Sequence, residues 1–123
     1  MDERHRTVLS VCSDRELARF RHDVLAGVGF QVVSVHTVSS HTVSSALYEI
    51  SFGRCGVLLL CHRLNKPSRE TLASYFHEHC PEPYIVSILA NEDDHYPPQT
   101  HARVVHSNDP APLVRALREN LAA

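Results

Sequence analysis

The sequence has 123 residues, the length of one domain with a single well-buried core. It is 43% hydrophobic and 21% charged, its formal net charge is -2, and its Lys and Arg residues are scattered. These features exclude the clustered positive charge of a nucleic-acid-binding or membrane-surface protein. No apolar run approaches the roughly 18–20 residues that cross a bilayer, and the charged residues 1–6 are unlike a secretory signal, so we expect one cytoplasmic domain over residues 1–123.

Cysteine and histidine are the residue types that carry candidate chemistry. In a cytoplasmic protein the 4 Cys are expected to be reduced thiols, and none of them forms a CxxC pair. The 10 His are dispersed along the chain. Dispersal favours solvated surface residues, although imidazoles that titrate near neutrality also suit a pH sensor.

The chain begins with a short strand and an amphipathic helix. Residues 7–11 are apolar and β-branched and predict a strand. Ser13, followed three residues later by Glu16, fits a capping box and predicts a helix start. The predicted buried face of this helix consists of Leu17, Phe20, Val24, Leu25 and Val28. Residues 31–35 predict a second strand.

The connection after the second strand contains a duplication. The five residues HTVSS occur twice in succession, over 36–40 and 41–45. Two copies are too few for a repeat architecture, and loops tolerate insertions at little cost. Because either Ser-Ser pair suits an N-cap, the sequence offers two competing starts for a helix that includes residues 46–52.

A short apolar run without alternation lies at the middle of the chain. Residues 57–60 predict a strand buried on both faces, which is typical of the centre of a parallel sheet. Asn65 then opens a third helix, in which Pro67 is tolerated because it falls in the first turn.

The last third of the chain predicts two more strands, over 84–89 and 102–105. Between them, residues 91–99 lack an apolar period and contain two prolines, which predicts a loop or one distorted turn. Asp109 followed by Pro110 predicts the start of a final helix.

Five strands that alternate with helices predict an α/β fold built from right-handed βαβ units. We expect a flavodoxin-like, doubly wound, five-stranded parallel sheet with strand order 2-1-3-4-5 and a fourth helix that is short or missing. Sites in such sheets lie beyond the carboxyl ends of the strands, where Cys61, His62 and Arg63 follow the central strand. Adjacent strand residues point to opposite faces, so we expect Cys61 and His62 not to share a pocket.

Several features share one layout: the spacing of strands one and three, the Ala46-Leu47 pair, Pro83 before strand four, and Asp109-Pro110 before the final helix. With this layout the chain resembles a response-regulator receiver (CheY-like) domain from end to end. The resemblance implies a magnesium-binding acidic pair after strand one and a phosphoacceptor Asp at the end of strand three. It also implies a Ser or Thr after strand four and a Lys after strand five.

The acidic positions of that site are changed in this sequence. The acidic pair falls on Cys12 and Ser13, and only the neighbouring Asp14 is acidic. The phosphoacceptor position falls on Cys61. A thiol is a poor ligand for magnesium, which prefers oxygen.

The remaining positions of the site are changed as well. The Ser or Thr position falls on Ile88 and the Lys position falls near Ser107. Phosphoryl transfer needs a carboxylate nucleophile, a hard cation and a fixed positive charge. The resemblance therefore implies a degenerate pseudo-receiver that lacks the phosphorylation site.

We expect from this a protein-interaction or scaffold module in bacterial signal transduction that is not an enzyme and uses no cofactor. Its expected partner is a protein, such as another signalling protein, rather than nucleic acid or a membrane. A homodimer is a further option, since receivers commonly pair through the fourth helix, fifth strand and fifth helix.

The alternative is a thiol-based redox sensor or a zinc site. Strands one and three are neighbours in the predicted order, so Cys12 and Cys61 would project into one pocket, with His106 as a third zinc ligand or with a disulfide between the thiols. The competing explanation is structural: both cysteines would simply be small buried residues of the core. The sequence also lacks the spacing of a typical metal-ligand motif. A hydrolase with a Cys–His pair is disfavoured because no oxyanion-hole glycine motif accompanies Cys61.

Overall fold

The structure of the protein is a computed structural model that describes residues 3–35 and 41–122. His36 and the first HTVSS copy, residues 36–40, lie outside the described residues. The helix that follows begins at His41, the first residue of the second copy.

The described strands form one parallel sheet of five strands, in the predicted order β2-β1-β3-β4-β5. The strands are β1 (Thr7–Val11), β2 (Gln31–Val35), β3 (Val57–Leu60), β4 (Tyr84–Leu89) and β5 (Ala102–Val105). Every residue of β1 and β3 is buried, as expected for central strands covered on both faces.

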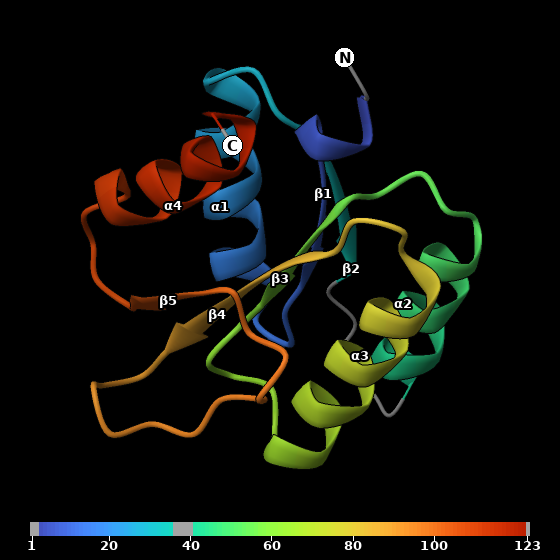
Figure 1. Cartoon of the computed structure of the whole chain (residues 1–123). Coiled ribbons are helices and arrows are strands. Elements are labelled where there is room, and N and C mark those ends of the chain that lie inside the picture. The colour runs from blue at the N-terminus through green and yellow to red at the C-terminus, as the bar shows by residue number, and fades with distance from the viewer. Residues whose placement is uncertain (1–2, 36–40, 123) are drawn as a thin grey trace.

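Helices cover both faces of the sheet (Figure 1). After a short 3-10 helix, η1 (Glu3–Arg6), the α-helices are α1 (Arg15–Gly27), α2 (His41–Ser51), α3 (Lys66–His79) and α4 (Ala111–Ala122). α1 and α4 lie on one face, and α2 and α3 lie on the other. Among the described residues, none of the helices has the length and apolar character needed to cross a membrane.

The connection between β4 and β5, residues 90–101, contains turns and no helix. The fourth helix of the chain, α4, is present and follows β5. The buried Arg69 of α3 holds the connection in place, because its Nη1 donates to the His95 carbonyl at 2.8 Å and pairs with the Asp94 carboxylate at 3.5 Å. Asp94 also accepts from the backbone N–H of Ala90 at 2.8 Å.

The start of α1 differs from the prediction. Asp14 is the N-cap, and its Oδ1 accepts from the backbone N–H groups of Glu16 and Leu17 at 3.0 and 3.2 Å. A carboxylate satisfies these amides and suits the positive end of the helix dipole. The predicted cap Ser13 is therefore wrong, and its hydroxyl instead donates to the Arg63 carbonyl at 3.2 Å.

The buried face of α1 also differs from the prediction. Ala18, Arg21 and Leu25 are buried, whereas Phe20 and Val28 are 45% and 36% exposed. The predicted face is therefore wrong at Phe20 and Val28. The physical reason is that a polar side chain, Arg21, occupies the middle of the inward stripe and finds partners at the edge of the sheet.

Candidate functional site

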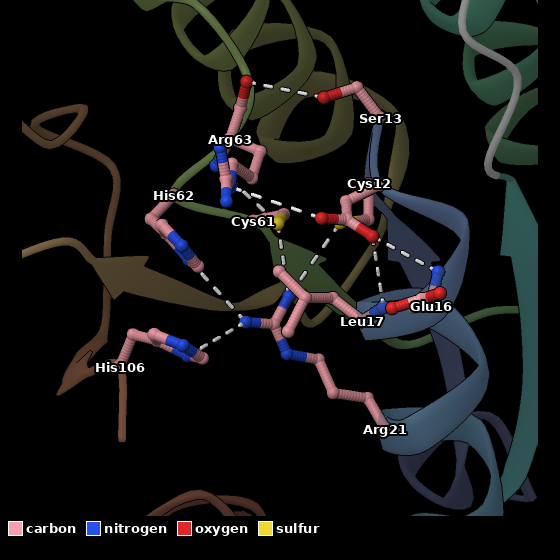
Figure 2. A network of polar contacts seen from close by, with 10 residues as sticks. Cys12, Ser13, Glu16, Leu17, Arg21, Cys61, His62, Arg63 and His106 are labelled. Carbon is pink, nitrogen blue, oxygen red and sulfur yellow. Dashed lines mark hydrogen bonds and ion pairs between the residues drawn. The ribbon is translucent and has the colours of Figure 1, made fainter. Parts of the chain in front are cut away.

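The carboxyl ends of three strands meet around the guanidinium of Arg21 (Figure 2). Cys12 follows β1, Cys61 and His62 follow β3, and His106 follows β5. Arg21 extends toward them from α1. These side chains define the Arg21 pocket: Cys12, Arg21, Cys61, His62 and His106.

Arg21 donates to sulfur on one side and faces imidazole nitrogen on the other. Its Nη1 lies 3.0 Å from the Cys61 Sγ and 3.8 Å from the Cys12 Sγ. Its Nη2 lies 3.4 Å from the His62 Nδ1 and 3.5 Å from the His106 Nδ1. A guanidinium only donates hydrogen bonds, so each Nδ1 accepts with its lone pair. The two imidazole rings stack with centroids 4.3 Å apart.

The two thiols of the pocket differ in acidity. The pKa of Cys61 is lowered to about 6, and the largest cause is a hydrogen bond from the Cys12 thiol. The charge of Arg21 and the backbone N–H of Arg63 lower this pKa further, and together these effects outweigh burial, which raises it. The same hydrogen bond, together with burial, raises the pKa of Cys12. At neutral pH the pocket therefore holds one thiolate, Cys61, and one thiol, Cys12.

His62 is neutral in this pocket above acidic pH. Burial is the largest effect, and the positive charges that develop on His106 and reside on Arg21 add to it, which lowers the His62 pKa to about 4. A neutral ring leaves its Nδ1 lone pair available to the guanidinium, in agreement with the observed contact.

Cys61 and His62 both contact Arg21, which contradicts the expectation that they would not share a pocket. That expectation applied the alternation of a β-strand. The last residue of β3 is Leu60, so Cys61 and His62 lie in the turn beyond the strand, where alternation no longer holds.

The other predicted positions lie around the pocket rather than in it. The register pairs Leu60 with Ser87, and the next β4 residue, Ile88, is buried and lines a cavity together with Arg21 and His106. The hydroxyl of Ser107 donates to the Asp109 carbonyl at 3.2 Å. From the segment after β5, it is His106 whose side chain reaches Arg21.

Asp14, the acidic residue of the predicted pocket, serves the helix instead. Its Oδ1 accepts the two amides of the α1 cap, and its Oδ2 lies 4.0 Å from the Arg63 Nε. Ser13 is likewise directed to the backbone of Arg63. The side-chain oxygens of Asp14 and Ser13 therefore have partners outside the Arg21 pocket, and neither residue takes the place of the magnesium-binding acidic pair that the resemblance implies.

Magnesium, which the resemblance implies, does not fit the Arg21 pocket. Mg²⁺ takes oxygen ligands in near-octahedral geometry. The atoms that converge here are sulfurs and imidazole nitrogens, and a guanidinium already supplies positive charge among them. These residues therefore offer no oxygen ligand set for a magnesium ion.

The predicted zinc set of Cys12, Cys61 and His106 is not assembled either. The described part of the chain holds no group of three or more His, Cys, Asp or Glu side chains that could hold a metal ion. The guanidinium of Arg21 lies between the His106 ring and the two sulfurs (Figure 2).

Arg21 is the central residue that is absent from the predicted site. A signal for it is present in the sequence, because Arg21 lies four residues after Leu17 and four before Leu25. That spacing places it on the apolar stripe of a helix, where a buried cation requires a partner.

Solved structures of receiver domains share this fold. A receiver domain from Methylobacillus flagellatus is 17% identical and superimposes with a TM-score of 0.77, covering 94% of this chain and 98% of that one. The response regulator TrrA from Thermotoga maritima, in complex with Mg²⁺ and BeF, is 14% identical with the same TM-score of 0.77 and the same coverage of 94% and 98%.

Two further structures extend the comparison. A receiver protein from Sinorhizobium medicae is 19% identical with a TM-score of 0.73, covering 95% of this chain and 94% of that one. TrrA is also found in complex with the histidine kinase ThkA, with a TM-score of 0.77. No protein-family model and no curated protein matches the sequence. At these identities the likeness shows the fold: it is that of CheY-like response-regulator receiver domains.

Proposed function

We propose that this protein is a pseudo-receiver: a signalling module of receiver fold that binds a protein partner and takes no phosphoryl group. The observation that carries the proposal is the Arg21 pocket. Where a receiver keeps carboxylates and a metal ion, this chain has the sulfurs of Cys12 and Cys61 around a guanidinium. We propose that it is not an enzyme and works without a cofactor.

The charge of the pocket supports this proposal. Transfer of a phosphoryl group relies on metal ions and fixed positive charges that neutralise its oxygens. Here the guanidinium of Arg21 is already engaged by the Cys61 sulfur and both imidazoles. The carboxylate of Asp14 is engaged by the amides at the start of α1.

The surface through which receivers commonly pair is altered in this chain. The segment at the place of the fourth receiver helix consists of turns that Arg69 fixes through Asp94 and His95. We therefore propose a different signalling protein as the partner, in a cytoplasmic setting. A second copy of the chain is the other option, and native mass spectrometry of the purified protein separates the two.

Incubation with a small phosphodonor tests the proposal. The protein is mixed with Mg²⁺ and acetyl phosphate, and its intact mass is recorded, with a receiver domain that is phosphorylated by this donor as the positive control. We expect no phosphoryl adduct on this chain under conditions that modify the control. An adduct that maps to Cys61 or Asp14 would contradict the proposal.

A further inference from the structure

We propose that the Arg21 pocket is a thiol switch for small hydroperoxides, in which Cys61 attacks the peroxide and Cys12 then closes a disulfide with it. The inference rests on the proposed function in one respect, that the pocket takes no phosphoryl group. In this proposal, oxidation of the two sulfurs replaces phosphorylation as the signal, and it acts at the same end of the sheet.

The sheet places the two cysteines side by side. β1 and β3 are parallel neighbours in which Val11 pairs with Leu60, and the Cys61 N–H donates to the Val11 carbonyl at 3.2 Å. Cys12 and Cys61 are the next residues along, at a strand spacing of about 4.8 Å. A disulfide requires Cα atoms roughly 4.4–6.8 Å apart, so the bond can close with little movement of the backbone. One nitrogen of Arg21, Nη1, lies 3.0 Å from the Cys61 sulfur and 3.8 Å from the Cys12 sulfur, so both sulfurs lie around the same guanidinium.

The surroundings of Cys61 favour the thiolate. Its sulfur accepts from the Arg21 guanidinium at 3.0 Å and from the backbone N–H of Arg63 at 3.4 Å. Thiolates beside cationic groups and amide donors are the reactive form of cysteine. The titratable and charged groups that face this sulfur, directly or through Arg21 and Arg63, are Cys12, Asp14, Arg21, His62, Arg63 and His106.

A small cavity lies against the pocket. It has a volume of about 30 Å³, and Arg21, Ile88 and His106 line part of it. That volume holds about one water molecule, so it suits hydrogen peroxide better than a bulky organic hydroperoxide. Arg21 both lines the cavity and contacts the Cys61 sulfur, so its guanidinium connects the cavity to the nucleophile, which does not itself line the cavity.

The chemistry balances with one hydroperoxide as the oxidant. The Cys61 thiolate attacks the terminal oxygen of ROOH, an S–O bond forms, the O–O bond breaks, and the alkoxide leaves and takes a proton from water to become ROH. The Cys12 sulfur then attacks the sulfenic acid of Cys61, an S–S bond forms, and hydroxide leaves with the Cys12 proton as water. Two electrons pass from the thiols to the peroxide.

Oxidation changes the charge in the middle of the fold. The disulfide removes the negative charge that the Arg21 guanidinium faces in the reduced protein. The remaining contacts of the guanidinium are then the Nδ1 atoms of His62 and His106, which bring no negative charge. A cation that loses its buried counter-charge favours rearrangement of its surroundings. In this proposal, that rearrangement is the conformational change by which a partner distinguishes the oxidised protein from the reduced one.

Mass spectrometry after exposure to hydrogen peroxide tests the inference. We expect the reduced protein to lose two hydrogens, mapped to a peptide pair joined through Cys12 and Cys61. Cys12→Ser is expected to stop at a sulfenic acid on Cys61 that a 1,3-dicarbonyl reagent traps, and Cys61→Ser is expected to lose the reaction. The double variant Cys55→Ser, Cys80→Ser is the matched control and should retain the two-hydrogen loss.

Arg21 is tested as a positioning residue by Arg21→Gln and Arg21→Lys. Removal of the charge should raise the midpoint of the thiolate titration and slow the reaction at neutral pH roughly tenfold, with partial rescue by Lys. Circular dichroism checks that each variant is folded. Unchanged rates and titration in Arg21→Gln would refute the role of the guanidinium.

The outcomes that would overturn the switch are distinct from those of the phosphorylation test. A disulfide that joins other cysteines, or a Cys61 that reacts no faster than Cys55, refutes the switch and leaves the proposed function intact. Equal rates for hydrogen peroxide and cumene hydroperoxide refute the small cavity as the access route. A phosphoryl adduct refutes the proposed function whether or not the disulfide forms.

Discussion

Arg21 is a buried cation with an unusual set of neighbours. Its residue is only 4% exposed, and among the described residues its side-chain partners are Cys12, Cys61, His62 and His106. A buried charge is costly unless it is paired, and only Cys61 can provide the opposite charge here. The acidity of Cys61 and the burial of Arg21 therefore depend on each other.

This dependence predicts how stability responds to pH. Cys61 has an ordinary pKa of 9.0 and a pKa of about 6 in the folded protein, so the folded state releases its proton at lower pH. Between these two values the unfolded state binds more protons, and the free energy of unfolding should rise with pH by up to about 1.4 kcal/mol per unit. Urea unfolding of the reduced protein across this range measures the rise.

Other groups set the limits of this window. The lowered pKa of His62, about 4, makes stability rise with pH at more acidic values. The raised pKa of Cys12 has the opposite sign and should reduce stability above the ordinary thiol pKa of 9.0. Cys61→Ser isolates the effect, because the slope between about pH 6 and pH 9 should disappear in it. An equal slope in this variant would assign the pH dependence to other residues.

At the scale of residues, the sequence brings Cys12 and Cys61 together but misses Arg21 and His62. Cys12 and Cys61 could be placed together because a strand order fixes which carboxyl ends are neighbours. The spacing of Arg21 places it on the apolar stripe of α1, but the predicted face of that helix included Phe20 in its place. The partners of the Arg21 guanidinium, at the ends of β1, β3 and β5, become visible only in the structure. His62 was misplaced because the alternation of β3 was extended beyond its last residue, Leu60.

At the scale of elements, Gly56 fixes how β3 begins against η1. Its N–H donates to the carbonyls of Arg4 at 2.8 Å and Thr7 at 3.2 Å. A Cβ at this position would lie 2.4 Å from the Arg4 carbonyl oxygen, so the backbone itself would have to move. The entry into the central strand therefore requires a residue without a side chain.

This close approach predicts that Gly56→Ala is destabilising. Overpacking of this kind typically costs about 1–3 kcal/mol, measured as the change in the free energy of unfolding in urea. Gly27→Ala is the matched control, because its Cβ would meet no atom within 4 Å and Ala is the better helix former. A loss in Gly56→Ala no larger than the change in Gly27→Ala would contradict the prediction.

The connection between β4 and β5 shows what an element-level pattern can and cannot predict. Two prolines and the lack of an apolar period predicted turns in residues 91–99, and turns are present. The contact that holds this connection was not predictable from the pattern. Arg69 lies on α3, far from the connection in the sequence, and reaches Asp94 and His95 only through the packing of α3 against the sheet.

At the scale of the whole molecule, the strand order of the sheet can be predicted from the sequence, whereas the effect of the Arg21 pocket on the rest of the protein cannot. Short β-branched runs separated by capped helices predict a doubly wound parallel sheet, right-handed crossovers reduce its topologies to a handful, and 2-1-3-4-5 is one of the common strand orders. The fold is shared with receivers at 13–19% identity, which shows that very different sequences form it.

The proposed disulfide predicts a change in global stability with two opposing parts. A bond from residue 12 to residue 61 closes a long loop in the unfolded chain, which by chain entropy alone stabilises the fold by about 4 kcal/mol. The same bond removes the thiolate that Arg21 faces, and an uncompensated buried cation offsets much of this gain. Oxidation of the natural chain should therefore raise the free energy of unfolding by clearly less than the entropic figure.

The variant Arg21→Gln separates these two parts. It keeps the loop closed by Cys12 and Cys61 but removes the cation, so its gain in stability on oxidation should exceed that of the natural chain. Urea unfolding of both proteins in reduced and oxidised form gives the two gains directly. Equal gains would mean that loss of the Cys61 thiolate does not destabilise the protein through Arg21. The change of charge in the pocket could then not drive a rearrangement of the surrounding fold.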